Sequence, residues 1–177
     1  MSGEHVLVCV AWPYANGPLH LGHVAGCYLP PDIQARFERS KGNKVLMVSG
    51  SDEHGTPITV AAETQGVNPQ DIVDKYHAIN SKALLDLGCS WEPKIDPRGP
   101  DYGGSLFNRT SDPEHHEIVS ENFVSLLNAG LFERKVMQQY YEIREDGGRF
   151  LPDRYVEGDC PNCGATDARG DQCDECG

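Results

Sequence analysis

The sequence lacks the features of a membrane or secreted protein. A membrane-spanning helix needs about 20 consecutive apolar residues, and no such run occurs in the 177 residues. The N-terminus also has no basic segment, no long apolar core and no small-residue cleavage site of a secretion signal. We therefore expect a cytoplasmic protein that does not cross a membrane.

Basic residues are scarce as well. The 15 Lys and Arg are outnumbered by 27 Asp and Glu, which gives a net charge of −12. A surface that grips nucleic acid along its whole length needs Lys and Arg to contact the phosphates. The composition therefore argues against such a surface. Acidic residues also keep a protein soluble, so nucleic acid held elsewhere stays compatible with this charge.

Two short apolar runs indicate parallel strands. His5 to Ala11 is almost continuously apolar, as expected for a strand covered on both faces, and Lys44 to Val48 is the next such run. The helical stretch between them extends from about Leu21 to Lys41. Two prolines should divide it into two pieces, the second starting near Pro31. Strand, helix and strand form a βαβ unit in a parallel sheet.

Further helices follow at residues 56–65, at 68–87 and after Asp112-Pro113, each ended by a glycine. Helical spacing predicts buried faces made of Ile72, Tyr76, Ile79, Ala83 and Leu87 in the second of these, and of Ile118, Phe123, Leu126 and Leu127 in the third. Residues 92–104 are rich in Pro and Gly and are interpreted as a loop or insertion.

These elements predict an α/β fold with a Rossmann-type parallel sheet. Residues 1–134, including the loop at 92–104, are expected to form this part, and residues 135–177 are expected to form a separate region.

Two histidines, His20 and His23, follow the first strand at the expected start of a helix. A helix N-terminus offers unpaired N–H groups and positive dipole character, which favour phosphate. Imidazoles three positions apart point the same way and can donate to phosphate oxygens, and Gly22 leaves the backbone open to a nucleotide. Two surface histidines beside a turn are the alternative. The strand-to-helix crossover, where α/β proteins bind nucleotides, favours the functional interpretation.

A second polar motif, GSDEHGTP at residues 50–57, follows the second strand. The carboxyl ends of parallel strands meet at one edge, so this motif should face the two histidines across a crevice. Asp52 suits an ammonium group, and His54 suits a phosphate or a ribose. Acidic residues before Thr-Pro also favour a helix start, so a helix cap explains the motif equally well when it is taken alone.

Four of the seven cysteines form two Cys-x-x-Cys pairs, at Cys160 and Cys163 and at Cys173 and Cys176. Each pair lets two thiolates meet one tetrahedral ion, and the loop between them can fold back to bring the pairs together. Disulfides and a redox pair are alternatives. A redox site needs only one Cys-x-x-Cys pair, and the absence of a secretion signal argues against disulfides. We therefore predict one structural zinc site, with iron as the other metal that would fit.

At these residues the sequence resembles class I aminoacyl-tRNA synthetases, and among them the methionine enzymes. AWPYANGPLHLGH, residues 11–23, is similar to a nucleotide signature that isoleucine, valine and leucine enzymes share in general form. GSDEHGTP is more particular to methionine enzymes, as is FLPDRY at residues 150–155, which leads into the cysteines. Arg109-Thr110 and the helix start after it also match. The resemblance covers nearly the whole chain.

The resemblance implies methionine–tRNA ligase activity. L-Methionine would attack the α-phosphate of Mg-ATP to give methionyl-adenylate and pyrophosphate, and the aminoacyl group would pass to tRNA(Met). His20 and His23 would stabilise the triphosphate in the transition state, and Asp52 would bind the methionine α-ammonium. The implied ATP contacts are Ala11, Asn16, His20, Gly22 and His23, and the implied methionine contacts are Ala11, Trp12, Tyr14 and Asp52.

The resemblance implies that residues 1–134 are the first half of a Rossmann-type parallel-sheet nucleotide-binding fold, and that residues 135–177 are a connective region with a small zinc-knuckle insertion. It also implies parts that this sequence does not contain: a second βαβ half with a KMSKS-type loop, and anticodon-binding helices. We therefore expect the chain to be inactive, or nearly so, on its own. Two other function classes stay open. One is a free-standing nucleotidyltransferase, which also carries an HxGH signature. The other is a zinc-stabilised module that binds tRNA or a partner, and could pair with a separate C-terminal chain.

Overall fold

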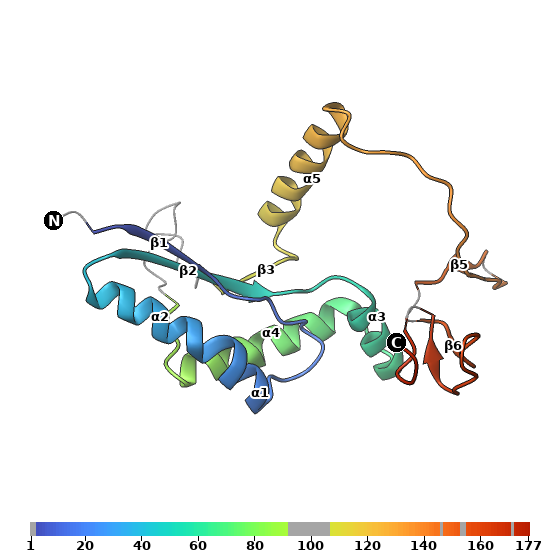
Figure 1. Cartoon of the computed structure of the whole chain (residues 1–177), viewed down its shortest axis with the longest axis horizontal. Coiled ribbons are helices and arrows are strands. Elements are labelled where there is room, and N and C mark those ends of the chain that lie inside the picture. The colour runs from blue at the N-terminus through green and yellow to red at the C-terminus, as the bar shows by residue number, and fades with distance from the viewer. Residues whose placement is uncertain (1–2, 92–106, 146, 153–154, 171) are drawn as a thin grey trace. The chain divides into compact units, whose positions relative to one another are not determined.

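A computed structural model of the chain describes residues 3–91, 107–145, 147–152, 155–170 and 172–177 (Figure 1). Its internal contacts divide the chain into two units, residues 1–125 and residues 126–177. The expected domain boundary after residue 134 stays a prediction. The expected insertion at residues 92–104 lies outside the described residues.

The first unit is built on a parallel sheet of three strands. Its elements are β1 (His5–Cys9), α1 (Leu21–His23), the π-helix η1 (Val24–Tyr28), α2 (Leu29–Ser40), β2 (Lys44–Ser51), α3 (Thr56–Gln65), α4 (Pro69–Asp86), β3 (Phe107–Arg109) and most of α5 (Pro113–Asn128). The strand order is β1-β2-β3, and both pairings are parallel. The predicted α/β fold with a parallel sheet is confirmed.

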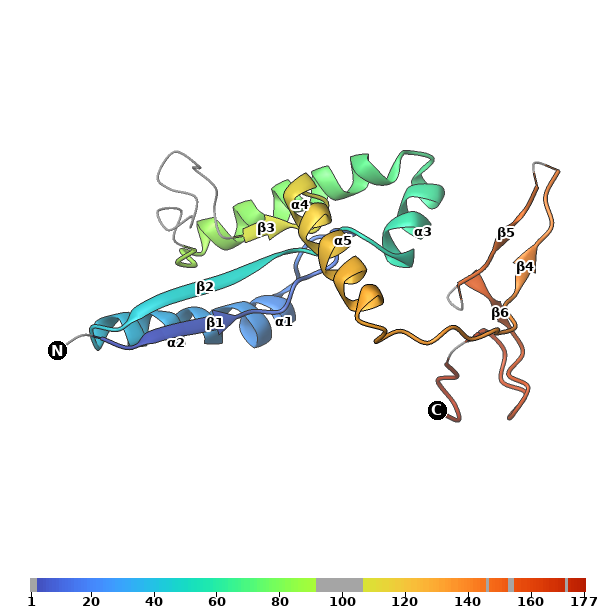
Figure 2. The same ribbon diagram turned by 90° about the horizontal axis from the view of Figure 1, so that it is seen from above.

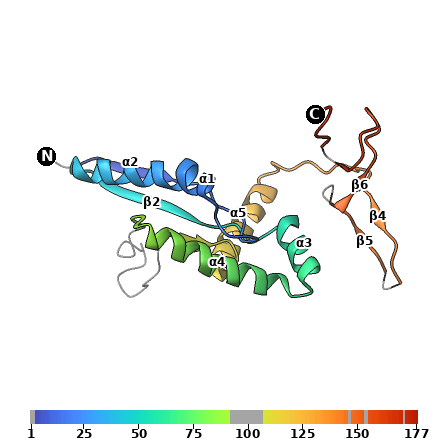
Figure 3. The same cartoon turned by 90° about the horizontal axis from the view of Figure 1, so that it is seen from below.

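Helices α2 and α4 lie on the same face of the sheet, as Figures 2 and 3 show from opposite sides. The main core lies between this face and the helices. Its buried members are Val10, Tyr28, Ala35, Val45, Met47, Leu84, Cys89, Trp91 and Phe107. The expectation that β1 is covered on both faces is wrong for the described residues, because alternate side chains of β1 are exposed and Leu7 is 60% exposed.

The prolines divide the first helical stretch two residues earlier than expected, because α2 begins at Leu29. Pro30 and Pro31 occupy first-turn positions, where a missing N–H breaks no intrahelical hydrogen bond. The preceding turn widens instead into η1, in which the Leu29 N–H donates to the Val24 carbonyl five residues back. The helical path therefore continues through the prolines.

Two of the expected buried helix faces are wrong. In α4, Ile72 is buried as expected, but Ile79 and Leu87 are 43% and 52% exposed. The buried face of α4 instead includes Asn80. A search for apolar residues at helical spacing does not find this residue, because its side chain is polar. In α5 no described residue is buried, and Ile118, Phe123, Leu126 and Leu127 are all exposed.

The second unit holds two small antiparallel sheets. β4 (Tyr141–Glu142) pairs with β5 (Arg149–Phe150), and β6 (Glu157–Gly158) pairs with β7 (Ala168–Arg169). β6 precedes Cys160 and β7 lies between Cys163 and Cys173, so their pairing folds back the chain that carries the two Cys-x-x-Cys sequences. Across both units, no helix within the described ranges combines the length and the apolar character needed to cross a membrane.

Candidate functional site

The segment that follows β1 encloses a cavity of about 330 Å³. Residues 11–19 form one side of it, and His23, Cys27 and Tyr28 complete it from the start of the helical stretch. Five of the predicted site residues line this cavity: Ala11, Trp12, Tyr14, Asn16 and His23. The structure thus brings together much of the predicted ATP and methionine pocket, at the sheet edge where parallel folds bind ligands.

The two signature histidines form a reciprocal cap at the start of α1. The His23 N–H donates to His20 Nδ1, and the His20 N–H donates to His23 Nδ1, both at 3.3 Å. Their rings stack with centroids 3.7 Å apart. A Cβ atom on Gly22 would lie 3.0 Å from the His20 ring, so the glycine leaves room for this stack.

Asp52 is joined to the same segment through the backbone. It forms an isolated parallel bridge with Tyr14: the Asp52 N–H donates to the Pro13 carbonyl at 2.8 Å, and the Ala15 N–H donates to the Asp52 carbonyl at 2.9 Å. The predicted ammonium ligand therefore lies beside the predicted pocket residue Tyr14. The His54 N–H also contacts Asp52 Oδ1 at 3.4 Å.

Trp12 lies across the end of β2. A Cβ atom on Gly50 would be only 2.5 Å from Trp12 Cζ3 and would overlap the Asn108 carbonyl oxygen. Gly50 therefore allows the indole to pack directly on the strand. The other side of Trp12 faces His115 of α5, with ring centroids 6.1 Å apart.

Predicted His54 lies outside the cavity. Its Nε2 is 3.0 Å from His116 Nε2 and 3.2 Å from the Thr110 carbonyl oxygen. These contacts join the loop after β2 to the start of α5.

Sequence reasoning missed a buried ion pair next to Asp52. The Glu53 side chain is fully buried, and Arg109 Nε donates to its two oxygens at 2.8 and 3.0 Å. Arg109 Nη2 also donates to Asp74 of α4 at 2.6 Å, and this contact lowers the pKa of Asp74. Although burial acts to lower the pKa of Arg109, its hydrogen bonds to both carboxylates raise it overall. The signal was the Glu inside GSDEHGTP and the Arg beside Thr110.

Asn80 of α4 was also missed. Its side chain is fully buried; Oδ1 accepts the Leu19 N–H at 3.0 Å, and Nδ2 donates to the Gly17 carbonyl at 3.1 Å. Both contacts hold the loop immediately before His20. A polar residue inside an apolar helical repeat was the available signal.

The four clustered cysteines come together in the second unit. Their sulfur atoms all lie within 4.8 Å of one another, with Cys160 Sγ 3.7 Å from Cys176 Sγ and Cys163 Sγ 3.6 Å from Cys173 Sγ. The backbone N–H groups of Cys163 and Asn162 lower the pKa of Cys160 to about 6. A lowered pKa favours the thiolate of Cys160, the form that binds metals.

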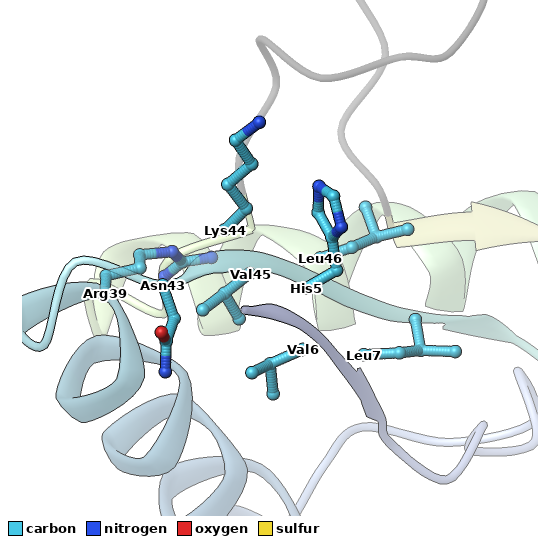
Figure 4. Close-up of a pocket in the computed structure, with 8 residues that line it drawn as sticks. All are labelled: His5, Val6, Leu7, Arg39, Asn43, Lys44, Val45 and Leu46. Carbon is cyan, nitrogen blue, oxygen red and sulfur yellow. The ribbon is translucent and has the colours of Figure 1, made fainter. Parts of the chain in front are cut away.

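A larger cavity, of about 660 Å³, lies at the other end of the strands (Figure 4). It is lined by His5–Leu7 of β1, Lys44–Leu46 of β2, Arg39 and Asn43. Ligands of parallel sheets bind at the carboxyl ends of the strands, whereas these residues lie at the amino ends. Half of its lining residues are aliphatic, and it contains none of the predicted site residues.

Known proteins resemble this chain along nearly its whole length. The family model described as tRNA synthetases class I (M) matches residues 6–177. The methionine–tRNA ligases of Roseiflexus sp. and Bifidobacterium adolescentis are each 50% identical over 174 residues, which is 98% of this chain. The chain spans only 27% and 26% of the length of these two relatives.

Two solved synthetase structures share the fold of this chain. A Mycobacterium tuberculosis methionyl-tRNA synthetase in complex with methionyl-adenylate is 28% identical, with a TM-score of 0.59 over 73% of this chain and 22% of that one. An Agrobacterium radiobacter LeuRS in a ternary complex with tRNA and LeuAMS, 23% identical, shares the fold with a TM-score of 0.65 over 96% of this chain and 20% of that one. Because the family model covers almost the entire sequence, the chain belongs to the class I (M) tRNA synthetase family.

Proposed function

We propose that this chain supplies the first part of the active site of a methionine–tRNA ligase. The carboxylate of L-methionine attacks the α-phosphate of Mg-ATP, the bond to pyrophosphate breaks, and methionyl-adenylate forms. A hydroxyl of the terminal adenosine of tRNA(Met) then attacks the activated carbonyl and releases AMP. The observation that carries this proposal is the cavity after β1, which gathers five of the family's signature positions next to Asp52.

The residues divide the two substrates between them. His20 and His23 stabilise the negative charge that builds up on the phosphates, and Asn16 and Gly22 contact the nucleotide. Asp52 binds the α-ammonium of methionine through opposite charge. Ala11, Trp12 and Tyr14 line the same cavity as Asn16 and His23, and they contact methionine there.

Pyrophosphate exchange tests this proposal. We would compare the chain alone with a hybrid, in which this chain replaces the matching 27% of the Roseiflexus ligase in one polypeptide. Exchange of labelled pyrophosphate into ATP should depend on methionine and should occur in the hybrid but hardly at all in the chain alone. A separately expressed remainder of the Roseiflexus ligase, mixed with this chain, should restore part of the activity.

Two variants separate the substrates. Asp52→Asn should raise the KM for methionine, because a charge-assisted contact of about 1.5–3 kcal/mol is lost, with little effect on the KM for ATP. His20→Ala should mainly lower kcat. Lys82→Ala, a change at an exposed position of α4, is the control. A hybrid whose exchange does not depend on methionine would refute the assignment.

We also propose that the four cysteines hold one structural zinc ion. Tetrahedral zinc with Zn–S bonds of about 2.3 Å separates its sulfur ligands by about 3.8 Å, close to the two shorter distances here. All four positions would be taken by protein, so the ion would stabilise the second unit rather than take part in chemistry. Elemental analysis should find one zinc per chain, and none after Cys160→Ser with Cys173→Ser.

A further inference from the structure

We propose that Glu53, Arg109 and Thr110 are positioning residues for amino-acid binding. They hold the end of β2 so that Asp52 keeps the direction in which it can receive the α-ammonium of methionine. The inference rests on the proposed function for the role of Asp52. It adds three residues that do not themselves touch the substrate.

The direction of Asp52 follows from its two neighbours. Ser51 is completely buried and Glu53 is buried, whereas Asp52 between them is partly exposed. Successive side chains of an extended segment point to opposite sides. Ser51 and Glu53 both point to the inner side, toward α4, whose His77 contacts Ser51. The Asp52 side chain between them therefore points to the outer side, away from α4.

Four hydrogen bonds hold Glu53 on the inner side, and His77 Nδ1 lies 3.7 Å from its Oε1. Arg109 Nε donates to both carboxylate oxygens, and the Ser111 hydroxyl donates to Oε2. The backbone N–H of Glu53 donates to Thr110 Oγ1 at 2.8 Å. A fully buried carboxylate is stable only when such partners satisfy it, so any movement of the loop would leave it unpaired.

The contacts of Glu53 with Arg109, Ser111 and Thr110, here called the clamp, are anchored to β3 and α4. Arg109 is the last residue of β3 and is paired in register with Ser51, and the Thr110 N–H donates to the Ser51 carbonyl at 3.1 Å. Arg109 also reaches Asp74 of α4. His77, one turn further along α4, lies 2.8 Å from Ser51 Oγ through its Nδ1. The loop is thus held against both the sheet and α4.

Asp52 is consequently fixed from both sides. The bridge to Tyr14 holds its backbone on the side of the cavity, and the Glu53 contacts hold the chain on the opposite side. A carboxylate held in this way loses little conformational freedom when it binds a cation, which is the physical advantage of preorganisation.

The test uses a nearly isosteric change in the hybrid ligase. Thr110→Val removes the oxygen that accepts the Glu53 N–H, and Thr110→Ser retains it. We expect Thr110→Val to raise the KM for methionine about fivefold to tenfold, as expected for one lost hydrogen bond, with the KM for ATP nearly unchanged. Thr110→Ser should behave like the unchanged hybrid. Arg109→Lys keeps the positive charge but loses the guanidinium group that contacts Glu53 and Asp74 together, so it should also raise the KM for methionine.

A ligand without the amino group separates positioning from general support. The methionine analogue that lacks the α-amino group is measured as an inhibitor of exchange in each variant. If the clamp acts through Asp52, Thr110→Val weakens methionine but leaves the affinity for this analogue unchanged. If both ligands weaken equally, the clamp only supports the fold and the proposal is overturned.

Two further variants fix the interpretation. Arg36→Lys disturbs a similar pair, in which Arg36 Nε donates to the buried carboxylate of Asp32 at 2.8 Å, and should leave the KM for methionine unchanged. Asp52→Asn gives the reference effect. If Asp52→Asn raises the KM and Thr110→Val does not, the positioning role fails while the proposed function stands. If neither raises it, the ammonium role of Asp52 fails as well.

Discussion

Replacing Asn80 should loosen the loop that precedes the signature histidines. Its amide makes one hydrogen bond to the Leu19 N–H and one to the Gly17 carbonyl, and the side chain is completely buried. Asn80→Ala removes both bonds and leaves a donor and an acceptor of the loop without partners. His20 follows Leu19 directly, so the loss should reach the part of the site proposed to bind ATP.

The cost can be worked out from these two contacts. Gly17 and Leu19 are partly rather than fully buried, so each unpaired group should cost about 1 kcal/mol, the lower end for buried polar groups. Alanine favours a helix interior over asparagine by about 0.5 kcal/mol, which offsets part of this. We therefore expect Asn80→Ala to lower the free energy of unfolding of the first unit by about 1.5 kcal/mol.

Urea unfolding followed by tryptophan fluorescence measures this quantity directly. The two tryptophans, Trp12 and Trp91, both belong to the first unit, so the signal is specific to it. Lys82→Ala on the same helix is the control; its ion pair with Asp86 is exposed and should be worth less than about 1 kcal/mol. A loss below about 0.5 kcal/mol for Asn80→Ala would show that water replaces the amide, and would refute the reasoning.

Three other outcomes follow from the structure. Burial, and then the nearby Arg109, lower the pKa of His77 in the folded chain. As the pH falls below about 6.5, the unfolded chain therefore binds a proton at His77 before the folded chain does, and the free energy of unfolding decreases. His77→Gln should make the free energy of unfolding depend less on pH in urea titrations between about pH 5 and 7.5. Gly50→Ala should destabilise the first unit by about 1–3 kcal/mol through overlap, whereas Gly26→Ala, with open space around its Cβ, should not reduce stability in thermal melts. A zinc chelator should increase the rate of amide hydrogen exchange around β6 and β7 and leave tryptophan fluorescence unchanged.

The strands and helices were predictable because their signals are local. The apolar runs at residues 5–11 and 44–48 correspond to β1 and β2, and glycines after α3 and α4 end those helices as expected. The cysteine spacing likewise predicted a four-sulfur cluster. In each case the information lies within a few residues of the element it determines.

What was missed depends on contacts between distant residues. β3 has only three residues, and its place in the sheet is set by pairing with Ser49–Ser51, more than fifty positions away. The Glu53–Arg109 pair spans a similar separation. The inner face of α4 was misassigned because a buried asparagine is recognisable only once its partners in another loop are known.

The reciprocal cap of His20 and His23 also determines where their protons lie. A backbone N–H can only donate, so each Nδ1 that receives one must be the unprotonated nitrogen of its ring. Both neutral imidazoles are therefore Nε2–H tautomers, and each presents an N–H donor on the side away from the helix backbone. The motif can therefore offer two N–H donors to phosphate oxygens.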